Sequence, residues 1–171
     1  MLQSSEFIEP VEVAGLAPWP GGRRKPCAFD NGACPVVRTG QTLVVSSQAL
    51  AGYRILLAED GAIIALQLAR SLELAGAAVL GPVATVDDGL AALKANPIDC
   101  AVLDFALGHQ DSLPIAEEAQ RRHIPFVFLT GHDAAGVLPE AFASACWLEK
   151  PFIPAQLIQR ILELLEPMET L

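Results

Sequence analysis

Five short apolar runs alternate with helix-like segments along residues 53–166. The runs are 55–58, 78–83, 100–103, 126–129 and 146–148. Each is too short for an ordinary helix and is bounded by residues that break regular structure, so each is predicted to be a strand. Strands that alternate with helices form βαβ units, and unbroken apolar strands are buried on both faces of their sheet. The sequence therefore predicts a three-layer (βα)5 α/β fold with a doubly wound, parallel, five-stranded sheet.

The segments between the runs have the period of amphipathic helices. Helices are expected at 61–75, 86–95, 113–122 and 133–143, and from Pro154 onward, where proline suits the first turn. The first of these helices is expected to have one apolar stripe, which consists of Ile64, Ala65, Leu68, Leu72 and Ala75. Thr85 is expected to cap the second helix, because Asp88 three residues later completes a capping-box pattern.

Residues 1–52 differ in composition from the rest of the chain. Five prolines interrupt them, and no helical or alternating period persists, so they are expected to form a flexible or poorly structured N-terminal extension. The folded domain is expected at 53–166, followed by a short tail at 167–171.

Charge and apolar content exclude several classes of protein. The formal net charge is −9, and residues 1–52 contain as many acids as bases, so the rest of the chain carries the whole excess. A DNA-binding domain usually has a basic face, which neither part provides. No unbroken apolar run reaches the roughly eighteen residues of a membrane span. The N-terminus lacks the pattern of a secretory signal, so a cytoplasmic location without membrane insertion is expected.

Polar side chains follow four of the five predicted strands. Glu59 and Asp60 follow the first strand, Asp104 the third, Thr130 the fourth and Lys150 the fifth. In an open α/β sheet, ligands bind beyond the carboxyl ends of the strands, so we expect these side chains to share one edge. Crowded carboxylates repel one another, and a bound Mg²⁺ ion would relieve that repulsion.

The same set of side chains suits phosphoryl transfer, which depends on positioning and charge neutralisation. Lys150 offers an ammonium group and Thr130 a neutral hydroxyl donor. A carboxylate oxygen can attack phosphorus to form an acyl phosphate. Asp104 comes from the middle of the predicted sheet and is the natural nucleophile.

Four segments at these strand ends resemble the receiver domain of response regulators. They are ILLAED (55–60), DCAVLD (99–104), FVFLTG (126–131) and WLEKPF (147–152). The resemblance implies a flavodoxin-like or CheY-like fold with strand order 2-1-3-4-5. It also implies that Asp104 accepts a phosphoryl group from a sensor histidine kinase or a phosphotransfer protein, in a two-component phosphorelay.

The resemblance implies a Mg²⁺ site. Asp60 would bind the ion directly, and Glu59 would help mainly through water. Asp104 and the backbone carbonyl of Ala106 would be further ligands.

The resemblance also implies a switch. Thr130 would be the hydroxyl that moves to hold the phosphoryl group, and Lys150 would pair with that group. The Lys150–Pro151 bond is cis in the family. Trp147 occupies the position of a mobile aromatic switch residue, and packing in the core is an equally good interpretation of it.

A narrower resemblance is to the stand-alone receivers called the FAT GUY group. It is carried by the segments PIAEEA (114–119), IPFVFLTG (124–131) and LPEAF (138–142). The group has a Phe-Ala-Thr-Gly run, in which Leu129 replaces the alanine here, and His132 follows the glycine. This resemblance implies an alphaproteobacterial receiver associated with kinases of the HWE type.

The sequence thus predicts a single-domain response regulator that signals through protein–protein contacts with an unidentified partner. It would catalyse its own phosphorylation and dephosphorylation without being a conventional enzyme. The alternative is a phosphorylation-independent interaction module with a receiver fold. A phosphatase of the haloacid-dehalogenase type would need a second aspartate two residues after the nucleophile, where this chain has Ala106.

Overall fold

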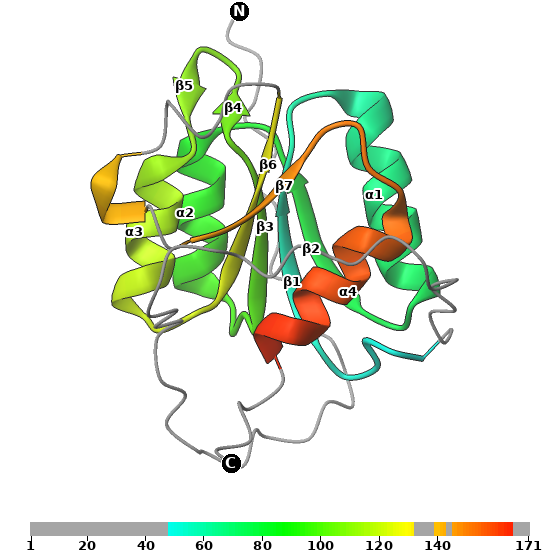
Figure 1. Cartoon of the computed structure of the whole chain (residues 1–171). Helices are drawn as coiled ribbons and strands as arrows, with labels where there is room; N and C mark the ends of the chain where they lie inside the picture. The colour runs from blue at the N-terminus through cyan, green and yellow to red at the C-terminus, as the bar shows by residue number, and fades with distance from the viewer. Residues whose placement is uncertain (1–47, 132–138, 143–144, 166–171) are drawn as a thin grey trace, which may run out of the picture.

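A parallel five-stranded sheet lies at the centre of the structure, a computed structural model that describes residues 48–131, 139–142 and 145–165 (Figure 1). Its strands are β1 (Arg54–Ala58), β2 (Ala78–Val83), β3 (Cys100–Asp104), β6 (Phe126–Thr130) and β7 (Cys146–Glu149). They lie in the order β2-β1-β3-β6-β7. Since β6 and β7 are the fourth and fifth strands of the predicted sheet, the predicted order and fold class are confirmed.

Helices cover both faces of this sheet (Figure 1). Helices α1 (Ala62–Leu74) and α4 (Pro154–Leu165) pack on one face, and α2 (Val86–Ala95) and α3 (Leu113–Arg121) pack on the other. Ile55 and Leu57 of β1 lie in the core of the first face, and Leu56 lies in the core of the second. This alternation follows from the pleat, which sends successive side chains to opposite sides.

Local sequence signals account for the start of two helices. The Thr85 hydroxyl oxygen accepts a hydrogen bond from the Asp88 N–H at 3.1 Å and donates its proton to the Asp88 carboxylate at 2.6 Å. This cap begins α2, as predicted, and Pro154 begins α4. The stripe predicted for α1 is buried except at Ile64, which is 42% exposed. None of the helices in the described ranges is both long and apolar enough to cross a membrane.

The chain packs against the domain before Tyr53. Leu50 is fully buried, and its N–H donates to the carbonyl of Ala75 at 2.8 Å, just beyond the end of α1. The packed part of the chain therefore begins inside the predicted extension. Residues 1–47, the tail at 167–171 and most of the predicted helix at 133–143 lie outside the described residues. Within that helix, Glu140–Phe142 form the short 3-10 helix η2.

A small antiparallel hairpin follows β3, and the sequence analysis did not predict it. Its strands are β4 (Ala106–Leu107) and β5 (Gln110–Asp111), with Leu107 paired to Gln110. Gly108 and His109 form the two-residue turn, in which Gly108 has a φ of 66°. A positive φ at the first turn residue but not the second is typical of a type II′ turn. The hairpin rises above the carboxyl end of the sheet (Figure 1).

Candidate functional site

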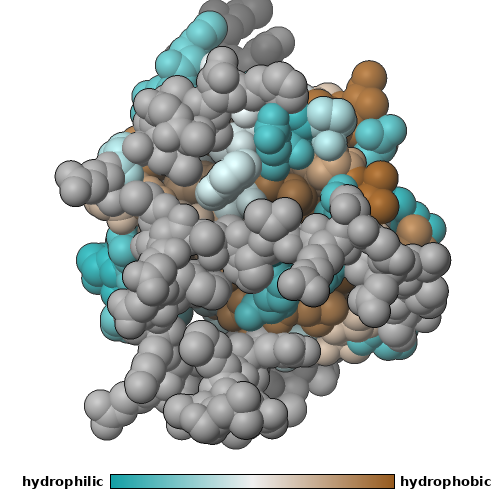
Figure 2. Space-filling model, in the orientation of Figure 1, coloured by the Kyte–Doolittle hydropathy of each residue, from teal (hydrophilic) through white to brown (hydrophobic). Residues whose placement is uncertain are grey.

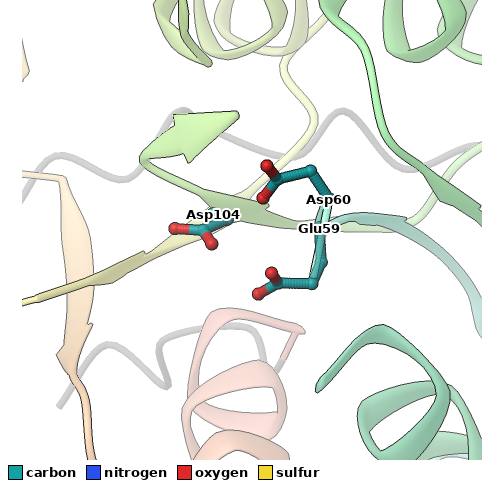
Figure 3. Close-up of side chains that lie close together, drawn as sticks. All are labelled: Glu59, Asp60 and Asp104. Atoms are coloured by element: carbon teal, nitrogen blue, oxygen red, sulfur yellow. The ribbon is translucent and has the colours of Figure 1, made fainter. Parts of the chain in front are cut away.

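Three carboxylates meet at the carboxyl end of the sheet (Figure 3). Asp104 ends β3, and Glu59 and Asp60 follow the neighbouring strand β1. One oxygen of each group lies within 4.8 Å of the others. Asp104 is 7% exposed and Glu59 is 3% exposed, whereas Asp60 is open to solvent. The three acids that the sequence assigns to one sheet edge are therefore brought together.

Lys150 bridges the two buried acids. Its Nζ donates to Asp104 Oδ2 at 2.7 Å and to Glu59 Oε2 at 3.0 Å. The other oxygen of Glu59, Oε1, accepts the N–H of Gly61 at 2.9 Å. Both oxygens of Glu59 are thus engaged with the protein, which leaves the exposed Asp60 as the more accessible ligand of the pair.

The carboxyl groups of the site outnumber its ammonium group, and the pKa values of Asp104 and Lys150 are both raised. Burial raises the pKa of Asp104 from 3.8 to about 6, Lys150 opposes that rise, and the charge of Glu59 adds to it. Burial alone would lower the pKa of Lys150, but its contacts with Asp104 and Glu59 outweigh burial and raise that pKa. The site thus contains three carboxyl groups, and the ammonium group of Lys150 contacts only two of them, an arrangement that favours an additional cation.

Thr130 ends β6, the strand beside β3. Its side chain is buried, and its hydroxyl has no hydrogen-bond partner among the described residues. An unpaired buried hydroxyl costs about 1–3 kcal/mol, so this group favours a ligand that can accept its proton. The backbone N–H of Lys150 donates to the Thr130 carbonyl at 2.7 Å, which ties the two residues together. The Lys150–Pro151 peptide is cis, as the resemblance implies.

Two further predicted residues lie at and below this edge of the sheet, Ala106 just beyond the end of β3 and Trp147 within β7. The N–H of Ala106 donates to Asp104 Oδ1 at 3.3 Å, so the start of the hairpin is held beside the acid. Trp147 is paired with Phe128 across β6 and β7 and packs, partly buried, against the core under α2 and α3. Its switch role stays a prediction, and His132 lies outside the described residues.

Comparison with known proteins agrees with this geometry. Residues 55–162 match the family described as the response regulator receiver domain. The chain belongs to this family. Receivers are signalling modules rather than conventional enzymes, and membership places the chain in two-component signalling.

The solved structures that resemble this chain include two that are more than 30% identical to it. A response regulator receiver protein from Sinorhizobium medicae is 32% identical, with 66% of this chain and 94% of that chain covered and a TM-score of 0.58. SdrG from Sphingomonas melonis is 36% identical, with 69% and 98% covered and a TM-score of 0.59. A CheY-like receiver domain protein from Methanospirillum hungatei, 24% identical with 66% and 93% covered and a TM-score of 0.58, shows the fold alone. No curated protein matches the chain.

The donor atoms of this receiver suit a hard divalent cation. Mg²⁺ binds oxygen ligands, takes one or two carboxylates and keeps several waters. Here the candidate ligand atoms are carboxylate oxygens, and the exposure of Asp60 leaves room for water beside it. The residues present therefore fit the ion that the family implies.

One contact of the receiver site was missed by the sequence analysis. The N–H of Gly108, at the tip of the β4–β5 hairpin, donates to Asp60 Oδ2 at 3.1 Å. The signal available in the sequence was a glycine at the first position of a two-residue turn, which is weak without its flanking strands.

Proposed function

We propose that this receiver accepts a phosphoryl group on Asp104 from the phosphohistidine of a sensor histidine kinase or a phosphotransfer protein. One observation carries the proposal. The buried carboxylate of Asp104 lies beside the Lys150 ammonium group and two further acids, at the carboxyl end of the central strand. A structural ion pair alone would not need the two neighbouring acids, which repel Asp104.

The proposed transfer is a substitution at phosphorus. A carboxylate oxygen of Asp104 attacks, the new O–P bond forms as the P–N bond breaks, and the leaving imidazole keeps the electron pair of the broken bond and takes up a proton. Asp60, Asp104 and the Ala106 carbonyl would hold Mg²⁺, with Glu59 acting through water. The bound ion supplies positive charge at the phosphoryl oxygens.

The residues of this chain account for the remaining steps. Lys150, which bridges Asp104 and Glu59 here, would turn to the phosphoryl oxygens. The hydroxyl of Thr130, which has no partner within the part of the chain that the structure describes, would donate to the same group. Its movement would shift the population of states at the adjoining strand β7. Trp147 lies on β7 and would either follow this movement or remain packed. The receiver would thus promote its own phosphorylation and dephosphorylation.

We further propose a single-domain, cytoplasmic regulator of the FAT GUY group, whose partner kinase is of the HWE type. The segments PIAEEA and IPFVFLTG support the subgroup. The similarity to SdrG covers 98% of that solved chain, which therefore contains little beyond a receiver domain. Signalling would then proceed through protein–protein contacts.

The test of the phosphoacceptor uses acetyl phosphate and MgCl₂, with intact mass as the readout. Wild type should gain one phosphoryl group, and Asp104→Asn should gain none. Asp87→Asn, which alters an exposed acid on α2, is the matched control and should behave as wild type. Modification of Asp104→Asn to the wild-type extent would refute the proposal. Equal partner binding by both proteins would favour the phosphorylation-independent module.

Exposed apolar side chains beside the site support a protein as the phosphoryl donor. Ile63 and Leu66, on the first turns of α1 after Asp60, are 75% and 71% exposed. Ile153, just beyond the Lys150–Pro151 bond, is 58% exposed. Figure 2 shows apolar residues at the right edge of the molecule, where α1 lies in Figure 1. Such side chains are typical of a surface that a partner covers.

Phosphotransfer from a kinase should therefore depend on Leu66. We expect Leu66→Ser to slow transfer from the cognate kinase by about tenfold, the effect of one interface contact worth about 1.4 kcal/mol. Its reaction with acetyl phosphate should be unchanged, because the phosphate site is intact. Leu74→Ser is the matched control, since Leu74 is 59% exposed at the far end of the same helix. An equal loss with both donors would argue against a docking role.

A further inference from the structure

The side chain of Asp60 is held by a segment far away in the sequence. Asp60 is exposed at the start of the β1–α1 loop, and its Oδ2 accepts the N–H of Gly108 at 3.1 Å. Gly108 lies at the tip of the β4–β5 hairpin, directly after the strand that carries Asp104. The hairpin therefore links the two acids of the proposed cation site through the backbone.

The hairpin turn gives the Gly108 N–H its direction. Gly108 has a φ of 66°, and a Cβ built on it would meet no atom within 4 Å. A side chain at this position would thus be disfavoured by backbone conformation and not by crowding. The turn needs glycine for its shape, and that shape aims the N–H at Asp60.

We propose that Gly108 is a positioning residue that fixes the Asp60 carboxylate for cation binding. This inference rests on the proposed function, because it assumes that Asp60 is a Mg²⁺ ligand. The hydrogen bond occupies Oδ2 and leaves Oδ1 for an ion, since a carboxylate has two oxygens that accept independently. An exposed aspartate without such a partner would sample several rotamers. Fixing its side chain in one rotamer would then cost free energy when the cation binds, and the affinity for the cation would be lower.

The proposal predicts a reciprocal effect on the hairpin. If the hydrogen bond helps Asp60 to bind Mg²⁺, bound Mg²⁺ must strengthen the hydrogen bond by the same factor. Hydrogen exchange at the Gly108 N–H should therefore slow when MgCl₂ is added to the wild-type protein. Exchange at the same N–H in Asp60→Asn should not respond to MgCl₂.

The decisive experiment compares two glycine variants by NMR titration with MgCl₂. Gly108→Ala should bind Mg²⁺ about tenfold more weakly than wild type, the usual effect of losing an outer-shell partner of a metal ligand. Gly52→Ala is the matched control, because Gly52 also has a positive φ of 83° and open space where a Cβ would lie. Its affinity should equal that of wild type.

Equal affinity of Gly108→Ala and wild type, or an equal loss in both variants, would overturn the inference. If Gly108→Ala does not fold, the exchange measurement on wild type decides, and an unresponsive Gly108 N–H overturns the inference. Failure of the proposed function has a different signature. In that case Asp60→Asn would bind Mg²⁺ as wild type does, or Asp104 would not be modified by acetyl phosphate.

Discussion

Asp104→Asn should make the metal-free receiver more stable at neutral pH, although Asp104 is the proposed phosphoacceptor. Burial raises the pKa of Asp104 from 3.8 to about 6. A carboxyl group whose folded pKa exceeds its unfolded pKa binds its proton more tightly in the folded state. The stability that this group contributes is therefore fully present below its unfolded pKa and is lost as the pH rises through about 6.

The size of the effect follows from the same pKa. The rise from 3.8 to about 6 corresponds to about 3 kcal/mol of unfolding free energy. Asp104 is 7% exposed, so solvent reduces this value little. Asparagine resembles the protonated acid, and the Glu59–Lys150 ion pair remains in the variant. We expect Asp104→Asn to gain up to about 3 kcal/mol near pH 7.5 and almost nothing near pH 3.5.

Urea unfolding followed by far-ultraviolet circular dichroism, in the presence of EDTA, would measure this difference across that pH range. Asp87→Asn, at an exposed position on α2, is the control and should show no comparable gain. Saturating MgCl₂ should reduce the advantage of Asp104→Asn, because an ion that binds the folded wild type stabilises it. A gain that does not change with pH, or a loss near pH 7.5, would refute the reasoning.

Three other variants probe the charge and the buried hydroxyl of the site and the packing between α2 and α3. Thr130→Val should be neutral or stabilising by up to about 1 kcal/mol in urea unfolding, because the buried hydroxyl has no partner among the described residues; a large loss would contradict this. Gly89→Ala should destabilise by about 1–3 kcal/mol despite the helix propensity of alanine, since the new Cβ would overlap Ile115 across α2 and α3; Ile115→Val should recover part of that loss. Lys150→Met should raise the pKa of Asp104 beyond about 6, because the ammonium group lowers that pKa in the wild type. A carbon-detected NMR titration that showed no rise would contradict the ion pair between Lys150 and Asp104.

The sheet and most of the site could be predicted from the sequence because their signals are long or repeated. Each central strand is a continuous apolar run, and parallel strands must bring their carboxyl ends to one edge. That rule is enough to predict a shared position for the four charged residues that follow these strands, Glu59, Asp60, Asp104 and Lys150. Their proximity needed no knowledge of side-chain packing.

Strand patterns could not predict three features of the structure: the β4–β5 hairpin, the burial of Leu50 and the exposure of Ile64. Strands of two residues have no period, so the contact of Gly108 with Asp60 depends on tertiary structure alone. Leu50 is the one large apolar residue between Val45 and Tyr53 in an irregular segment, and its burial depends on the end of α1. Ile64 lies at the border of the apolar stripe, where a small rotation of the helix decides between core and solvent.

The unfavourable features of the site share one physical consequence. Three carboxyl groups cluster beside one ammonium group that contacts two of them, and the pKa of Asp104 is raised. A buried hydroxyl at Thr130 also lacks a partner among the described residues. Each feature costs stability in the metal-free protein, and each would be relieved by the cation or the phosphoryl group of the proposed function. A ligand shifts a conformational equilibrium only by its difference in affinity for the two states. The excess of carboxyl groups and the Thr130 hydroxyl supply such a difference in affinity. In a conformation that brings Thr130 and Lys150 to the phosphoryl group, the hydroxyl gains an acceptor and the ammonium group gains an additional anionic partner.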